Sequence, residues 1–439
     1  MTCTWTAGRP CARDPSTARE LCATSKEAPL LPLLTESADL LADYRPGRSF
    51  YFASDRGTLL AEGTAATVAT GPWGEAAAGL RAELAALHTL DQVDGAGVPG
   101  TPRPVVAVGV LPFDSDRPGH LVVPARIQES GPNAAARGPV ALPAAVPGGG
   151  GARPARSLPN PADYADGVAR AVERIRAGEL DKVVLARVLR VPGPVDAVHL
   201  LRRLAARDPH AYLFGAETGP VAGASAFQAP GSTLVGASPE LLLSRRGPLV
   251  VSNPLAGSAA RSPDPVEDRR RAAALLASSK DAYEHALVVR AIAERLRPFC
   301  LGLDVPAAPS LIRTATMWHL STRISGWLAD PDVSALRLAA AVHPTPAVCG
   351  WPTTTARRVI GELEPFDRGC YTGLVGWCDA SGDGEWALAI RCAQITEDGA
   401  MSVYAGAGIV AASDPSAELA ETSAKLRTIG AAAGLGEDL

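Results

Sequence analysis

Short runs of β-branched, aromatic and other apolar residues recur along this chain, several of them separated by tight turns, and they outnumber the possible βαβ units. The clearest lies over 49–70 (SFYFASDRGTLLAEGTAATVAT), and later runs flank turns such as SGDG at 381–384. Strands joined by tight turns pair antiparallel, whereas neighbouring parallel strands need a long crossover, usually a helix. The sequence therefore predicts an α+β fold with large antiparallel sheets flanked by helices, and argues against a doubly wound parallel sheet.

Composition along the chain predicts four consecutive parts. They are a loose N-terminal extension over 1–30, a strand-rich N-terminal part of the same fold over 31–129, a Pro/Gly/Ala-rich loop over 130–159, and the region with the candidate site over 160–439. In the last part, Asn160-Pro161 predicts a helix start and Lys182–Val191 a strand. Long helices are expected near Pro265–Pro298 and Asp414–Ile429.

Composition also excludes several classes of protein. Of the 439 residues, 47% are hydrophobic and 20% charged, which is enough for a large core and excludes a disordered chain. The net charge of −4 indicates neither a nucleic-acid nor a membrane partner. Without a secretory signal or a membrane-spanning run, and with eight cysteines of which none forms C-x-x-C, we expect a cytoplasmic protein with reduced thiols.

A glycine pattern near the C-terminus resembles a dinucleotide-binding motif. Gly406-Ala-Gly-Ile-Val-Ala411 fits G-x-G-x-x-A, but the chain ends at Leu439 without the further strand and acidic residue that such a fold needs. We therefore expect no nucleotide site. A glycine turn that brings backbone N–H groups close to an anionic ligand is the alternative.

Two predicted helices each carry an acid-x-x-acid pattern. Asp281 and Glu284 are three residues apart and share a face, as do Glu418 and Glu421, with Lys425 one turn further on. Four carboxylates without cysteine or histidine ligands suit a hard cation such as Mg²⁺. Two solvated helix faces would give the same pattern.

Two single residues stand out against apolar surroundings. Lys182 opens an apolar strand, and it is either a half-buried base or a strand-end lysine that reaches solvent. Glu240 precedes the apolar run LLL at 241–243. There it is either an acid whose raised pKa lets it donate a proton, or a helix-start residue favoured by the helix dipole.

A series of segments, in this order, resembles the chorismate-utilising enzymes, which include the isochorismate, salicylate, anthranilate and aminodeoxychorismate synthases. The resemblance is dense from about Asp163 to Gly430. The matching stretches are LDKVVLARVL (180–189), GASPELLL (236–243), NPLAGSAAR (253–261), ASSKDAYEHALVV (277–289), MWHLST (317–322), HPTPAVCGWP (343–352), EPFDRGCYTGLVGW (364–377), GDGEWALAIRCAQI (382–395) and YAGAGIVAASDPSAELAETSAKL (404–426).

The resemblance implies a chorismate-binding catalytic region with Mg²⁺ as cofactor. By position, Glu284 and Glu421 match the family's metal ligands, while Asp281 and Glu418 match acids that hold metal-bound waters. Lys182 matches a general base that activates water. Glu240 matches a general acid on the other side of the ring.

The resemblance also implies a set of substrate-binding residues. His319 matches a histidine near the ring, although a core histidine with satisfied hydrogen bonds explains it equally well. The other implied residues are Gly257 and Ser258 under the ring, Ala347 beside it, and Tyr371, Arg391, Gly406 and Lys425 at the substrate carboxylates.

Within the family, three features favour the isochorismate synthases. Ammonia-using members lack a lysine at the position of Lys182. A covalent lysine of the P-I-K-G loop is absent from PLAG at 254–257, and Ala347 replaces a threonine of salicylate synthases. Tyr371 is a departure, since several isochorismate synthases have phenylalanine there.

The implied reaction is the reversible isomerisation of chorismate to isochorismate, by water attack at C2 and loss of the C4 hydroxyl. No glutamine amidotransferase subunit is expected. The alternatives are a salicylate synthase, which adds pyruvate elimination, and a catalytically silent chorismate-binding homologue. The product could feed a catechol siderophore, menaquinone or another salicylate-derived metabolite.

Overall fold

The computed structural model describes residues 39–68, 72–93, 105–132, 155–219 and 231–435. The predicted N-terminal extension over 1–30 lies outside the described residues. So does 133–154, most of the predicted loop over 130–159.

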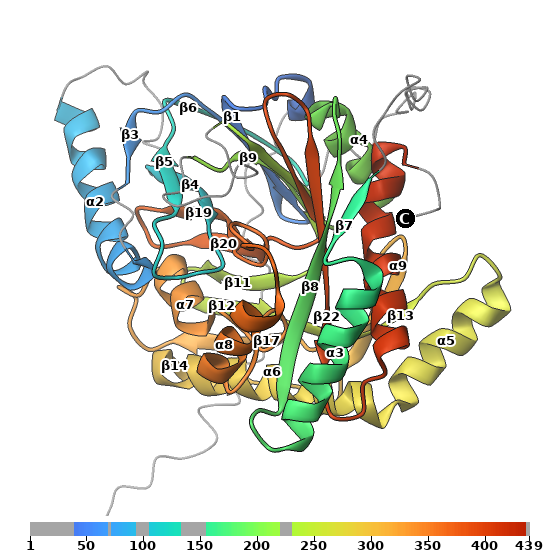
Figure 1. Ribbon diagram of the computed structural model, residues 1–439. Helices are drawn as coiled ribbons and strands as arrows, with labels where there is room; N and C mark the ends of the chain where they lie inside the picture. The colour runs from blue at the N-terminus through green and yellow to red at the C-terminus, as the bar shows by residue number, and fades with distance from the viewer. Residues whose placement is uncertain (1–38, 69–71, 94–104, 133–154, 220–230, 436–439) are drawn as a thin grey trace, which may run out of the picture. The chain divides into compact units, whose positions relative to one another are not determined.

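Two large antiparallel sheets and one small sheet organise the described residues (Figure 1). Sheet A holds, in spatial order, β18 (Gly350–Trp351), β8 (Lys182–Val191), β22 (Met401–Ile409), β21 (Cys392–Ile395), β10 (Thr233–Ser238), β9 (Tyr212–Glu217), β1 (Ser49–Ser54), β2 (Gly57–Glu62) and β6 (Arg126–Ser130), with β7 (Arg156–Leu158) on β8. Sheet B holds β14 (Cys300–Asp304), β17 (Ile324–Leu328), β12 (Leu249–Asn253), β11 (Leu241–Arg246), β20 (Gly384–Leu388), β19 (Leu374–Asp379), β4 (Val106–Leu111), β5 (His120–Val123) and β3 (Ala66–Thr67). Sheet C holds β13 (Leu255–Ala260), β16 (Met317–Ser321) and β15 (Ser310–Arg313).

Helices cover the outer faces of these sheets. They are α2 (Trp73–Val93), α3 (Pro161–Arg176), α4 (Ala197–Arg207), α5 (Pro265–Ala277), α6 (Ser279–Leu296), α7 (Ala335–Val342), α8 (Thr353–Leu363) and α9 (Pro415–Ala433), with 3₁₀ turns at Leu40–Ala42 and Arg297–Phe299. Among the described residues, no helix has the length and apolar character to cross a membrane.

The core has apolar layers on both sides of each large sheet. Phe52, Val108 and Phe214 belong to the cluster between sheets A and B. A second cluster joins the other face of sheet A to α4 and α9, and a third joins sheet B to α2, α6 and α7. Every strand pairing in the described residues is antiparallel, so the predicted α+β fold is confirmed.

Local sequence signals explain the ends of two helices next to the candidate site. The Asn160 side chain caps α3 by accepting a hydrogen bond from the Asp163 N–H at 3.0 Å. The Asp414 side chain caps α9 by accepting from the Ala417 N–H at 2.9 Å. In both helices the following proline takes the first helical position, where its missing N–H is not needed.

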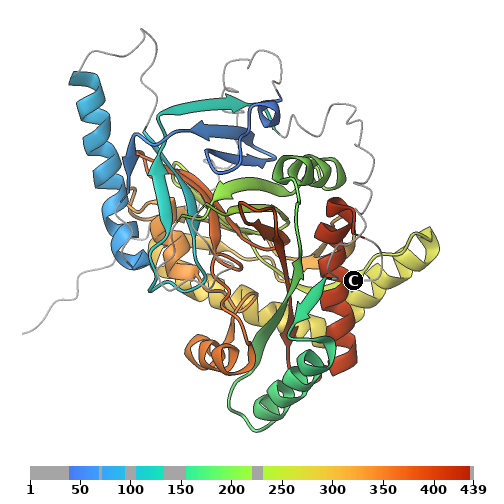
Figure 2. The same ribbon diagram turned by 45° about the horizontal axis from the view of Figure 1, so that its top comes forward.

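Two predicted boundaries were wrong. The helix expected over Pro265–Pro298 is two helices, because Ser278 adopts an extended conformation and caps α6 by accepting from the Asp281 N–H at 3.2 Å. As a result α5 diverges from α6, as Figures 1 and 2 show. At the end of the predicted loop over 130–159, Arg156–Leu158 form β7 on β8, since backbone pairing does not depend on the Pro/Gly/Ala-rich composition before it.

Candidate active site

One pocket collects most of the predicted site residues. It encloses about 640 Å³, part of which is open to solvent, and lies where sheets A and C meet helices α6 and α9. Of the predicted residues, it is lined by Glu240, Gly257, Ser258, Glu284, His319, Ala347, Tyr371, Arg391, Gly406, Glu421 and Lys425. Three predicted residues do not line it, namely Lys182, Asp281 and Glu418.

Lys182 lies directly behind the pocket wall. Its side chain has no exposed surface, and its Nζ is 2.9 Å from Glu284 Oε1. The Nζ makes no hydrogen bond of good geometry within the described residues, so it has unused hydrogen-bonding capacity. Lys182 is thus not a strand-end lysine that reaches solvent.

The acidic residues of α6 and α9 face each other, and each glutamate has a lysine partner. Lys280 Nζ is 2.8 Å from Glu418 Oε1, and Lys425 Nζ is 2.6 Å from Glu421 Oε1. Burial opposes ionisation of Glu284, but the charges of the surrounding lysines outweigh it and lower the pKa of this carboxyl. Glu284 and Glu418 are buried, so the alternative of two solvated helix faces is wrong.

These carboxylates fit a divalent cation in chemistry and charge. Burial, together with repulsion from Glu421, raises the pKa of Glu418, and burial with repulsion from Glu284 and Glu421 raises the pKa of Asp281. Such mutual repulsion is what a cation with oxygen ligands relieves. In the described residues no three His, Cys, Asp or Glu side chains converge closely enough to form a metal site by themselves. One or two protein carboxylates supplemented by water or substrate oxygens would suffice for Mg²⁺.

Glu240 lies between β10 and β11, where the chain passes from sheet A to sheet B. Its side chain is buried, and its Oε1 accepts a hydrogen bond from the Leu255 N–H at 3.3 Å. Burial raises the pKa of Glu240 to about 8, against the opposing effects of this hydrogen bond and of Lys182, Lys425 and Arg391. Glu240 is not at a helix start, and it is an acid that stays protonated at neutral pH.

Arg391 is a buried cation without an acidic partner. It donates to Thr428 Oγ1 at 3.3 Å and to His319 Nε2 at 3.2 Å, and none of the ion pairs in the described residues includes it. Its backbone φ is +50°, a conformation that non-glycine residues adopt rarely and mainly at functional sites. Because a buried charge needs a partner, this guanidinium favours an anionic ligand.

Thr372, which sequence reasoning missed, lines the same pocket with a φ of +62°. Its neighbour Tyr371 stacks on Tyr404 with ring centroids 4.9 Å apart. The carbonyl of Thr372 accepts a hydrogen bond from His343 Nε2 at 2.9 Å, so this strained stretch of the wall is fixed from behind.

Gly408 was also missed. Gly406 and Gly408 are two apart on β22, so both face the pocket, and a Cβ on Gly408 would collide with the carboxylate of Glu284. The expected glycine turn at 406 was wrong, because 401–409 is one continuous strand paired with β8. The period of two from Gly406 was the signal that would have found Gly408.

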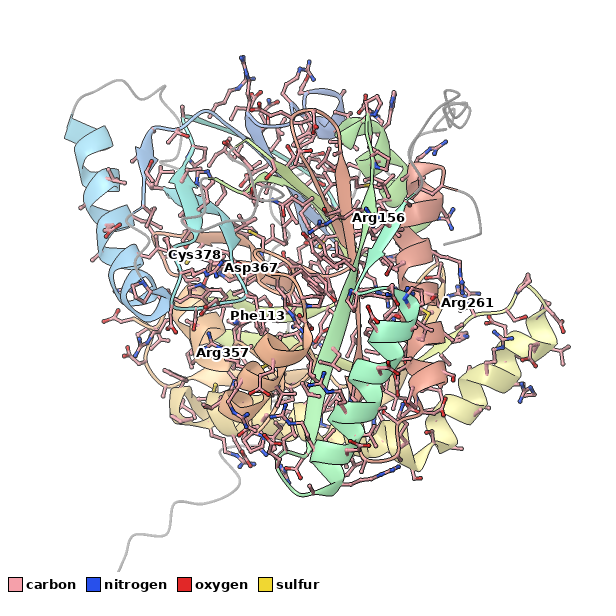
Figure 3. All side chains as sticks on the ribbon, in the orientation of Figure 1. Phe113, Arg156, Arg261, Arg357, Asp367 and Cys378 are labelled. Carbon is pink, nitrogen blue, oxygen red and sulfur yellow. The ribbon has the colours of Figure 1, made fainter. Side chains whose placement is uncertain are left out.

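A fully buried ion pair holds the wall together from outside the pocket. The Arg368 guanidinium donates to Glu364 Oε2 at 2.8 Å, to the Val184 carbonyl at 2.8 Å and to the Val348 carbonyl at 2.7 Å. It stacks on Phe113, labelled in Figure 3, at 4.7 Å from the ring centroid. Val184 and Val348 both line the pocket, so this pair fixes their positions.

Comparisons with known proteins identify the family of this chain. The profile of the chorismate binding enzyme family matches residues 152–434. The chain therefore belongs to that family, and the predicted resemblance to the chorismate-utilising enzymes is confirmed.

Individual relatives extend the match to nearly the whole chain. Isochorismate synthase DhbC of Bacillus subtilis is 48% identical over 403 residues, covering 91% of this chain and 97% of the relative. The crystal structure of DhbC from Bacillus anthracis superposes with a TM-score of 0.79 at 43% identity, covering 90% of this chain and 99% of that chain. Anthranilate synthase component I from Streptococcus pneumoniae, at 20% identity and a TM-score of 0.60 over 97% of this chain and 100% of that one, shares the fold.

Proposed function

We propose that this chain is an isochorismate synthase, an isomerase that interconverts chorismate and isochorismate with Mg²⁺. The observation that carries the proposal is that one pocket has both Lys182, buried beside it, and Glu240, an acid that is protonated at neutral pH. The high identity to isochorismate synthase DhbC over almost the full length of both chains supports it.

Chorismate is a dianion, and the pocket offers matching groups at separate points. We assign one substrate carboxylate to Arg391, whose guanidinium lacks an acidic partner in the described residues, with Tyr371 and Gly406 beside it. The other carboxylate lies toward Glu284 and Glu421. Mg²⁺ bound between these glutamates would neutralise that carboxylate and polarise its oxygens.

The chemistry requires a proton to leave an attacking water and another to reach a departing hydroxyl. In its amine form, Lys182 takes the proton from a water whose oxygen attacks C2, and the ring double bonds shift. Glu240 gives its proton to the C4 hydroxyl, which leaves as water. One water is consumed and one is released, so the net change is an isomerisation.

The alternatives fit less well. A salicylate synthase would need the pocket to promote pyruvate elimination, and Ala347 supplies no hydroxyl to orient the enolpyruvyl group. A silent chorismate-binding protein would have no use for a base and an acid together. Two further expectations stay predictions: that the protein works in the cytoplasm, and that it needs no amidotransferase subunit.

Product analysis of the purified protein tests the proposal. With chorismate and Mg²⁺ at neutral pH, we expect a mixture of chorismate and isochorismate that is the same from either starting compound. Salicylate fluorescence and a pyruvate-coupled assay on the same sample should give little signal. Stoichiometric salicylate and pyruvate would favour the salicylate synthase, and no conversion would favour the silent homologue.

A further inference from the structure

A chain of hydrogen bonds runs from one wall of the pocket to the other through His319. Ser258 on β13 and His319 on β16 are cross-strand partners in sheet C, and Ser258 Oγ lies 3.0 Å from His319 Nδ1. On the other side of the ring, His319 Nε2 is 3.2 Å from a terminal nitrogen of Arg391. All three residues line the pocket.

The chemistry of arginine fixes the proton of this histidine. A guanidinium has only donors, so His319 Nε2 must accept and cannot carry hydrogen. The ring proton is therefore on Nδ1, which donates to Ser258 Oγ. Burial, together with the charges of Arg391 and Lys425, lowers the pKa of His319 well below its usual value, so the ring stays neutral.

Both ring nitrogens are then in use, and neither is left to exchange a proton with a ligand. His319 instead sets the orientation of the Arg391 guanidinium. It holds one end of the Arg391 guanidinium while Thr428 Oγ1 holds another nitrogen at 3.3 Å. Because Ser258 Oγ accepts from Nδ1, its own hydroxyl hydrogen is free to be donated into the pocket.

We propose that His319 is a positioning residue, a neutral acceptor that aims Arg391 at a substrate carboxylate and makes Ser258 a hydrogen-bond donor to the substrate. The proposal rests on the function given above. It adds a role to the expectation that His319 lies near the substrate ring, and it differs from a core histidine because both partners face the pocket.

Kinetics of two substitutions test the proposal. His319→Phe removes the acceptor, and we expect the KM for chorismate to rise about 10- to 100-fold, since misplacing a binding group by an ångström has effects of this size. The kcat should stay within about threefold, and the pH profile should keep its shape. His319→Gln, whose amide can accept from Arg391 and donate to Ser258, should recover most of the affinity.

A fall in kcat with unchanged KM, or the loss of a limb of the pH profile, would overturn the proposal. The exposed His210→Gln serves as the control and should leave both constants unchanged. If His319→Phe fails to fold, the Gln variant still decides. A wild type that converts no chorismate would refute the proposed function instead.

Nitrogen NMR of the ¹⁵N-histidine-labelled full chain gives a readout that needs no turnover. The His319 signals, assigned by their loss in His319→Gln, should show a neutral ring protonated on Nδ1 from pH 5.5 to 8.5. A proton on Nε2, or a doubly protonated ring in this range, would contradict the positioning role.

Discussion

Two buried ion pairs contact strand β8, and they differ in how completely their polar groups are used. In the Glu364–Arg368 pair, both partners also bind backbone, since Glu364 Oε1 accepts from the Ala186 N–H at 2.8 Å and Arg368 donates to two carbonyls. In the Lys182–Glu284 pair, the Lys182 Nζ has no hydrogen bond of good geometry within the described residues, and the carboxylate faces a pocket.

The difference indicates which pair holds the fold and which does chemistry. A buried ion pair offsets its desolvation cost only when hydrogen bonds satisfy the rest of both groups, as around Arg368. A pair with unused hydrogen-bonding capacity beside a cavity can use it to bind a ligand or to transfer a proton. Glu364–Arg368 is therefore a clamp on the wall, and we assign Lys182–Glu284 to the proposed reaction.

Replacing the glutamates should separate the two pairs most strongly. Glu284→Gln, and likewise Glu421→Gln, removes a proposed Mg²⁺ ligand, so turnover should be abolished while the protein stays folded. Glu364→Gln should instead lower the free energy of unfolding by about 3 kcal/mol, because it breaks a buried pair. Urea titrations and rates at saturating chorismate and Mg²⁺ measure both effects. Wild-type-like turnover by Glu284→Gln or Glu421→Gln would refute the metal assignment.

Replacing the cations should give the next largest effect. Lys182→Ala should lose about 10²–10⁴ in rate, the usual contribution of a general base, and keep Mg²⁺-dependent chorismate binding by calorimetry. Arg368→Met should show the reverse. Its free energy of unfolding should fall by about 3–5 kcal/mol, while the folded variant should still convert chorismate. If Lys182→Ala stayed within about threefold of wild type, Lys182 would be structural like Arg368.

Glu240 is a third buried ionisable group, but it has no ion pair within the described residues, and burial raises its pKa to about 8. As the acid must be protonated, the rate should fall about tenfold per pH unit above 8, and Glu240→Gln should be slow and lack this limb.

The folded protein holds a proton that the unfolded chain releases near pH 4.5, so this group's contribution to stability falls from pH 4.5 to 8. The melting temperature of Glu240→Gln should thus rise relative to that of wild type as the pH increases across that window. A difference in melting temperature that stays constant with pH would contradict the raised pKa.

The smallest effect is expected at Gly408. An alanine there would collide with both the Glu284 carboxylate and Lys182 Cε and displace this pair, so we expect about a tenfold loss in rate with little change in stability. Gly167→Ala, on α3 with open space around its Cβ position, is the matched control and should be as active as wild type. Equal rates for both variants would show that the Lys182–Glu284 contact is not needed.

Much of this arrangement could be predicted, because some signals are local. Asparagine or aspartate before proline marked the starts of α3 and α9, and acid-x-x-acid spacing put Glu284 and Asp281 on one face. The sequence did not reveal that Glu284 is buried against Lys182, since that contact joins residues about a hundred positions apart. The clamp was hidden for the same reason, because EPFDR at 364–368 shows a charge pair but not the backbone it holds.

Running the reaction in H₂¹⁸O tests whether Lys182 activates a water that enters at C2. Isochorismate formed from unlabelled chorismate should gain one ¹⁸O, placed at C2 by mass spectrometry of fragments. Isochorismate that keeps only ¹⁶O would mean that the C4 hydroxyl is transferred within the molecule, and Lys182 would then have no water to activate.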